Sequence, residues 1–193
     1  MTDSPQTVDV RVGAGGDPLT LGLPVFAVAS LALGMGLLGL PAGLHVVAPL
    51  IILTTGLFQI IVTIWAVFLG QSAVALIFGL FSGFWLTLGS VLIGTTHGWF
   101  GITHVAAAEQ LIFICYATLF SFLFIPCLRL PAIYPIILVL IVAALSFAAA
   151  GIASIAGYLA LAFSFLGFWA SVNVAQVAFG GKPSPGLGKP FVS

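Results

Sequence analysis

Charged side chains are what this sequence has least of. Four Lys or Arg and four Asp or Glu make up 4% of its 193 residues, whereas a soluble globular domain carries roughly 25%. So few charges cannot cover a surface that faces water, so a soluble globular protein is excluded. The net charge is zero, which gives nucleic acid no basic surface to bind. With 62% hydrophobic residues, the chain is predicted to use the lipid bilayer as the solvent for most of its surface.

The residue patterns of enzymes and metalloproteins are also lacking. The sequence holds no phosphate-binding glycine loop, no nucleophile elbow and no paired carboxylates. Its two cysteines, Cys115 and Cys127, fall in or near one apolar run and match no disulfide or metal spacing. We therefore expect a protein that is not an enzyme and has no cofactor and no metal site.

Long apolar runs dominate what is there. They are continuous rather than alternating, which favours membrane-spanning helices over an outer-membrane barrel. A helix needs about 20 apolar residues, at 1.5 Å each, to cross a core of about 30 Å. Breaks rich in glycine, proline and polar residues separate six such runs. The predicted fold is an all-α membrane domain over residues 20–179, with spans at 20–40, 47–69, 72–94, 106–127, 131–150 and 154–178.

The two ends of the chain read as polar tails. Residues 1–19 have no basic start, so they are predicted to be a flexible tail rather than a cleaved signal peptide. Residues 180–193 are rich in Gly, Pro and Lys and are predicted to be a second flexible tail. With six spans, every Lys and Arg lies on the side of both termini. The positive-inside rule then predicts a multi-pass protein of the cell membrane with both termini in the cytoplasm. These residues are Arg11, Arg129, Lys182 and Lys189.

Small residues recur every three or four positions in two spans. In the third, Gly79 and Gly83 form such a stripe, and the sixth has a longer one. Such stripes let helices pack closely within the protomer. The alternative interpretation is that a stripe lines a pore or forms an oligomer interface. The residues of the sixth span are Gly157, Ala160, Ser164, Gly167 and Ser171.

Polar residues inside the spans are few. Thr55, Gln59 and Thr63 share one face of the second span, and an unsatisfied amide near mid-span is costly. Gln59 therefore either hydrogen-bonds to another helix or lines a hydrated path. Glu109 is the one acidic residue that enters a span, close to its start. It is either an interfacial residue or a group that handles protons or substrate.

Two segments resemble each other. Residues 80–85 and 164–169 share Gly-Phe-Trp and lie in the third and sixth spans, which run in opposite directions in a six-span protein. An inverted 3+3 repeat, common in transporters, predicts such a pair, and chance similarity is the alternative.

Three motifs resemble those of one known family. Residues 17–23, DPLTLGL, followed by Phe26, resemble the N-P-A-P-L-G-L signature that opens the first span of the acetate uptake transporter family, the succinate–acetate permeases. Residues 78–88, FGLFSGFWLTL, resemble the third-span motif of that family, and residues 168–180 resemble its closing motif. The resemblance covers nearly the whole chain.

The resemblance implies a six-helix protomer with its own central path, assembled as a ring-shaped homohexamer. It implies uptake of acetate and of succinate, often coupled to protons. By motif position, the apolar constriction of the family falls on Phe26, Phe81 and Ile141. Helix N-terminal amides after the proline signature would form a cradle for a carboxylate. The path residues implied are Asp17, Pro18, Thr20, Leu21, Gly22, Thr55, Gln59, Trp85 and Asn173.

The sequence also departs from the family pattern. Asp17 replaces the opening Asn, Phe81 replaces a Tyr of the constriction, and Asn173 replaces an acidic residue of the last span. Thr20 replaces the second proline of the signature. Most of these changes alter or remove polar or titratable groups along the path, which leaves proton coupling open. Two other functions therefore stay open, namely an accessory subunit of a larger membrane complex and a channel for small neutral solutes.

Overall fold

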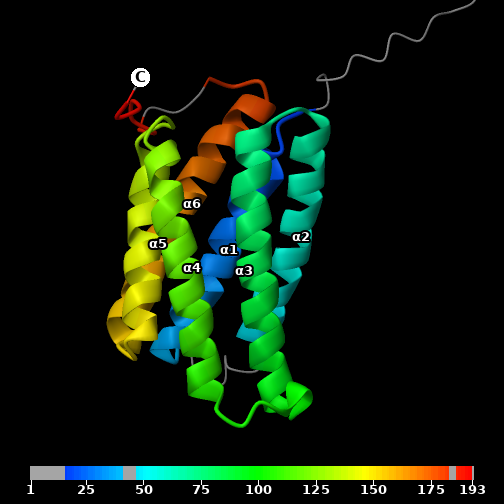
Figure 1. The fold of residues 1–193 in the computed structure, drawn as a ribbon. Helices are drawn as coiled ribbons and strands as arrows, with labels where there is room; N and C mark the ends of the chain where they lie inside the picture. Colours follow the sequence, from blue (N-terminus) through cyan, green and yellow to red (C-terminus); the bar gives the residue numbers. More distant parts are fainter. Residues whose placement is uncertain (1–15, 41–46, 183–185, 193) are drawn as a thin grey trace, which may run out of the picture.

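The computed structural model describes residues 16–40, 47–182 and 186–192, and these form a bundle of six α-helices (Figure 1). A short 3-10 helix, η2 (Trp99–Gly101), lies between the third and fourth helices. The helix limits differ from the predicted spans by at most two residues, so the all-helical fold is confirmed. Residues 1–15, including Arg11, lie outside the described residues. The helices are α1 (Leu19–Leu38), α2 (Ala48–Phe68), α3 (Ser72–Thr96), α4 (Val105–Cys127), α5 (Ile133–Ala149) and α6 (Ala153–Ala178).

Helix length separates α5 from the other five. Those five helices are long and apolar enough to cross a membrane, whereas α5 has 17 residues and extends over about 26 Å. It is as apolar as its neighbours and runs alongside α4 (Figure 1). A sixth crossing by α5 stays a prediction.

The sharp end of α1 comes from one glycine. Gly39 has a left-handed backbone with φ of 67°, which side chains with a Cβ rarely adopt. Its N–H donates to the carbonyl of Gly36 at 3.1 Å, and the Leu40 N–H donates to that of Met35 at 2.9 Å. This pattern closes the last turn and ends the helix.

α1 and α6 pack closely because their facing residues are small. A Cβ added to Gly34 would lie 3.0 Å from the Gly157 carbonyl oxygen, and one added to Gly157 would lie 3.1 Å from the Gly34 oxygen. The Ser164 hydroxyl donates to the Ala27 carbonyl at 2.8 Å. The small-residue stripe of α6 therefore packs against α1, which confirms the helix-packing interpretation.

The remaining helices form two antiparallel pairs around α1 and α6. α2 and α3 are in close contact, since a Cβ on Gly89 would lie 2.8 Å from the Leu53 backbone nitrogen. The Ser82 hydroxyl of α3 also donates to the Gly56 carbonyl of α2 at 2.9 Å. α4 and α5 form a hairpin that packs on α6 through α5 and approaches α3 more loosely. Figure 1 shows the two pairs on either side of α1.

The two Gly-Phe-Trp segments lie in different environments. Trp85 on α3 is buried, with 1% of its surface exposed, whereas Trp169 on α6 is 47% exposed. The inverted repeat stays a prediction.

Candidate functional site

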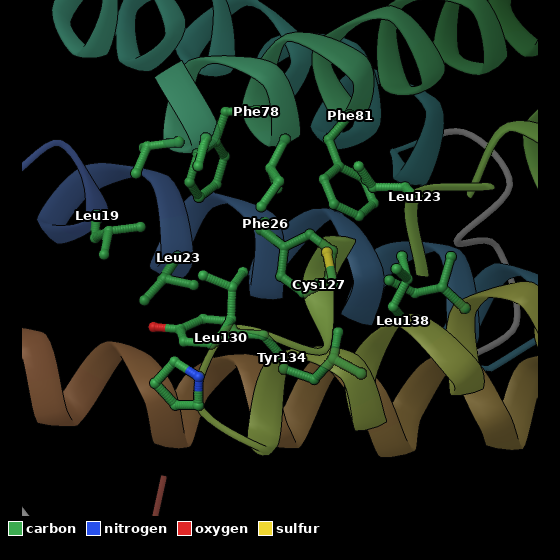
Figure 2. A pocket seen from close by; sticks show the side chains of 16 residues that line it. Leu19, Leu23, Phe26, Phe78, Phe81, Leu123, Cys127, Leu130, Tyr134 and Leu138 are labelled. Atoms are coloured by element: carbon green, nitrogen blue, oxygen red, sulfur yellow. The ribbon is translucent and has the colours of Figure 1, made fainter. Parts of the chain in front are cut away.

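A cavity opens between the helices near the end of the bundle where α1 begins and α4 ends. It encloses about 270 Å³, and its walls come from α1, α3, α4, α5 and the α4–α5 turn (Figure 2). The Tyr134 hydroxyl and the Cys127 thiol are the only polar side-chain groups in this lining. We call it the first cavity. Its lining residues are Leu19, Leu23, Phe26, Ala73, Val74, Ile77, Phe78, Phe81, Leu123, Cys127, Leu130, Pro131, Tyr134, Ile137, Leu138 and Ile141.

The three residues of the implied constriction all line the first cavity. The Phe26 and Phe81 ring centroids are 4.9 Å apart, with the rings tilted by 58°. Ile141 reaches the same cavity from α5 and is 2% exposed. The structure thus brings together residues of three helices that the family motifs selected. Their role as the narrowest point of a path stays a prediction.

An aromatic layer closes the first cavity toward the middle of the bundle. The rings of Phe81 and Phe120 stack with centroids 4.7 Å apart, and those of Phe26 and Phe163 lie 6.0 Å apart. Phe84 meets Phe120 edge-on at 6.3 Å. Each of these side chains is at most 5% exposed. We use the term aromatic layer for Phe26, Phe81, Phe84, Phe120 and Phe163.

A second cavity lies on the far side of the aromatic layer, where α1 ends and α4 begins. It encloses about 350 Å³ between α1, α2, α3 and α4. Its polar side chains are Thr95, Thr96 and the half-buried Glu109. Glu109 therefore faces a cavity rather than lipid alone. The lining residues of this second cavity are Ala32, Leu33, Gly36, Leu37, Ala48, Pro49, Ile52, Leu88, Leu92, Thr95, Thr96, Glu109 and Phe113.

The two cavities follow one another along the bundle without meeting, and no described residue lines both. On α1, the first cavity ends at Phe26 and the second begins at Ala32, about 9 Å further along the helix. On α3, the corresponding residues are Phe81 and Leu88, about 10 Å apart. A closed layer about two helical turns thick therefore separates two wider spaces.

The start of α1, implied as a carboxylate cradle, is occupied by the chain itself. The Asp17 carboxylate accepts a hydrogen bond from the Leu19 N–H at 2.9 Å. The Thr20 N–H and hydroxyl both donate to the Asp17 carbonyl, at 3.0 and 2.6 Å. The next two amides donate to the carbonyl of the buried Pro18. In this conformation, the first amides of α1 have no free hydrogen to offer an anion.

Two neighbours of this helix start have packing roles. A Cβ on Gly22 would lie 2.5 Å from the Phe78 ring, so the absence of a side chain lets this ring lie across α1 and line the first cavity. Leu21 is partly buried against the core and does not line either cavity. Gly167 on α6 makes similar room, because a Cβ there would lie 3.1 Å from the Phe26 ring.

The polar path residues of α2, α3 and α6 lie behind the cavities rather than in their walls. Gln59 is fully buried, and neither atom of its side-chain amide has a hydrogen-bond partner among the described residues. The same holds for the indole nitrogen of Trp85. Thr55 donates to carbonyls of its own helix, at 2.8 and 2.9 Å. Asn173 is buried on α6, at 4% exposure.

These orphaned polar atoms require an explanation. A buried polar group without a partner costs about 1–3 kcal/mol. The interhelical hydrogen bond that was one interpretation of Gln59 is not found within the part of the chain that the structure describes. The hydrated-path interpretation, in which water or a solute satisfies the Gln59 amide, stays open.

The motifs did not select α4, which supplies much of the site. Phe113, Phe120, Leu123 and Cys127 line the two cavities or the aromatic layer. Together with Tyr116, they recur at alternating steps of three and four residues, which places them on one helix face. That spacing was the available signal.

Comparison with known proteins gives a match among solved structures. No family model matches the sequence, and no curated protein does. Among solved structures, the fold is similar to that of the bacterial acetate channel SatP, with a TM-score of 0.78. The match covers 88% of this chain and 98% of that chain at 20% sequence identity. At this identity, the likeness shows that the two proteins share a fold.

Proposed function

We propose that this protein is a membrane channel for small monocarboxylates of the size of acetate, and a divergent member of the acetate uptake transporter family. The observation that carries the proposal is the pair of cavities separated by one aromatic layer. The fold that holds them is similar to that of an acetate channel. A channel function rather than an enzymatic one fits this arrangement.

The permeating form is the uncharged acid. Moving a carboxylate ion out of water into apolar surroundings costs several kcal/mol or more, unless a cation pairs with it. No Lys or Arg within the described ranges lines either cavity, and the first cavity has no charged side chain. The protonated acid escapes most of this cost. Acetate uptake then carries one proton per molecule without any relay residue in the protein.

The polar atoms beside the cavities fit such a solute. A carboxylic acid donates one hydrogen bond and accepts others. The Gln59 amide can do both, and the Trp85 indole N–H can donate. When the aromatic layer opens, these buried groups are available to a solute or to water. Their unpartnered state in the closed form favours this role.

Uptake of labelled acetate into proteoliposomes tests the proposal. Uncharged acids also cross lipid alone, so the flux in protein-free liposomes is subtracted. At fixed total acetate, the protein-dependent initial rate should fall about tenfold per pH unit well above the pKa of the acid, which is near that of a Glu side chain, about 4.3. Succinate, with two carboxyl groups, should enter far more slowly at neutral pH. Absence of protein-dependent acetate uptake at every pH and gradient would overturn the carboxylate proposal.

A channel for small neutral solutes is the second candidate. The almost wholly apolar first cavity favours it, since such a lining offers nothing specific to a carboxyl group. Stopped-flow measurements of ammonia, carbon dioxide and water permeability on the same proteoliposomes separate the two. Under the first proposal, these permeabilities match protein-free liposomes while acetate uptake does not.

Orientation and assembly complete the proposal. The described basic residues, Arg129, Lys182 and Lys189, all follow helices that end at the side where α1 begins. This distribution supports a cytoplasmic location for that side and for both termini in the cell membrane. The ring of six implied by the family resemblance is a further proposal. Native mass spectrometry of the detergent-extracted protein measures the number of protomers directly and would also reveal a different partner chain.

A further inference from the structure

The chain after α6 returns to the turn between α4 and α5. The Ile133 N–H donates to the Leu187 carbonyl at 3.0 Å, and the N–H groups of Phe191 and Val192 donate to the Leu128 carbonyl at 3.0 and 3.2 Å. Leu187 packs against the hydrophobic core. Figure 1 shows this segment, in red, beside the end of α4. We call residues 186–192 the C-terminal strap.

Two glycines let the strap lie this close to the helices. A Cβ on Gly188 would lie 2.7 Å from the Ala132 Cβ, and the φ of 74° at Gly188 disfavours any other residue there. Gly186 lies against α6, since a Cβ there would be 3.3 Å from the Trp169 indole nitrogen. The strap therefore contacts α6 near one end and the α4–α5 turn near the other.

The turn that the strap holds forms one wall of the first cavity. α4, α5 and the turn supply half of the lining, and α1 and α3 supply the opposite half. The α4–α5 hairpin packs on α6 but approaches α3 loosely. A movement of this hairpin away from α3 would widen the first cavity. It would also pull Phe120 of α4 away from Phe81 of α3 and so thin the aromatic layer.

We propose that the C-terminal strap is a latch that holds the α4–α5 hairpin in the closed position, so that its release opens the first cavity. The effect on solute flux rests on the proposed channel function, whereas the effect on cavity access does not. The strap is suited to release because all of its residues except Leu187 are exposed. Phe191 and Val192, whose amides make two of the three hydrogen bonds described above, are 61% and 46% exposed.

Cys127 provides a readout of cavity access that is independent of transport. Its side chain lines the first cavity and is 5% exposed. A Cys115→Ser background removes the other thiol, which is exposed. The rate at which iodoacetamide alkylates Cys127 then reports how open the first cavity is, and acetate uptake is measured on the same samples.

Three variants in that background test the latch. Deletion of residues 186–193 removes the strap. Gly188→Val pushes it off Ala132, whereas Lys189→Ala alters a neighbouring exposed side chain and spares the backbone hydrogen bonds. The first two should raise Cys127 alkylation and acetate flux by about two- to tenfold, as expected for the loss of one or a few surface hydrogen bonds. Lys189→Ala should match the parent protein.

A covalent lock gives the opposite perturbation. Ala132→Cys with Gly188→Cys in a chain lacking Cys115 and Cys127 joins the strap to the turn once the strap shifts by about 1 Å to reach disulfide geometry. Because a side chain at position 188 by itself crowds Ala132, the two redox states of the same protein are compared. Oxidation should give a lower acetate flux than reduction, while the flux of neither single-cysteine variant should depend on the redox state.

The outcomes distinguish the two proposals. Increased Cys127 alkylation on strap deletion, with no acetate flux in any sample, supports the latch and overturns the carboxylate channel. Normal acetate flux that neither deletion nor the lock changes, with unchanged alkylation, overturns the latch and leaves the channel standing. If the deletion fails to fold in gel filtration, the lock decides, because it compares the oxidised and reduced forms of one full-length protein.

Discussion

Phe81→Ala is the most direct perturbation of the aromatic layer. Phe81 is 5% exposed, and its ring contacts Phe26 at 4.9 Å and Phe120 at 4.7 Å between centroids. An aromatic pair contributes about 0.5–1.5 kcal/mol beyond area burial. In the proposed gate, both contacts are lost when the layer opens. Losing them should destabilise the closed state by about 1–3 kcal/mol relative to the open one, which shifts the equilibrium by roughly 5- to 140-fold.

The same substitution also weakens the fold. Truncating a buried Phe to Ala costs about 3–5 kcal/mol in soluble proteins. Thermal unfolding in detergent should therefore shift downward, and flux must be expressed per folded molecule. Phe122→Ala is the matched control, because Phe122 lies on the same helix as Phe120 but is 75% exposed. It removes the same atoms without touching the layer.

The assay is initial uptake of labelled acetate into proteoliposomes of equal protein content, with protein-free liposomes subtracted. Phe81→Ala should raise the protein-dependent rate severalfold or more, and Phe122→Ala should leave it near the parent value. A Phe81→Ala rate equal to that of the parent, in protein shown to be folded, would refute the gate. An equal increase in both variants would show a nonspecific leak instead.

Two further substitutions test the rest of the site and the packing beneath it. Gln59→Leu removes two buried polar atoms without partners, so it should stabilise the closed fold by about 1–3 kcal/mol. It should also lower acetate flux. A lower thermal midpoint of the variant would mean that the Gln59 amide is hydrogen-bonded in the folded protein. Gly89→Ala should lower the thermal midpoint more than Gly79→Ala. The new Cβ at position 89 would lie 2.8 Å from the Leu53 backbone nitrogen, whereas the one at position 79 would lie 3.3 Å from the Thr63 methyl group. Equal midpoints would contradict the close α2–α3 contact.

The limits of the helices could be predicted because the bilayer imposes them. Each apolar run must be about as long as the hydrocarbon core is thick, and glycine, proline or polar residues mark where it stops. The end of α1 at Leu38 is set instead by the left-handed Gly39. Several glycines lie near this end of the helix, and the sequence does not indicate which of them takes that conformation, so the predicted limit was two residues late.

The residues of the site could be predicted only where they belong to a family motif. Phe26, Phe81 and Ile141 come from three helices, and no periodicity in the sequence says that they meet. The face of α4 with Phe120 and Cys127 belongs to no motif, yet it borders the same cavity and layer. Two further features could not be predicted from the sequence. The Asp17 carboxylate accepts a hydrogen bond from its own helix, and the strap returns to the α4–α5 turn.

The scarcity of charge has a different meaning along the path than on the lipid-facing surface. Among the described residues, the acidic side chains are Asp17, which caps α1, and Glu109, which lines the second cavity. No described cation faces them from a cavity wall. A carboxylate ion would meet Glu109 in the second cavity and an uncompensated desolvation cost in the first. The protonated acid avoids most of that cost, and it brings its own proton. Under the proposed function, a path for that species has no need of a titratable relay. Phe81 and Asn173, at positions where the related motifs have Tyr and an acid, fit this proposal. The pH dependence of uptake should therefore follow the titration of the solute and stay unchanged when Glu109 is replaced by Gln.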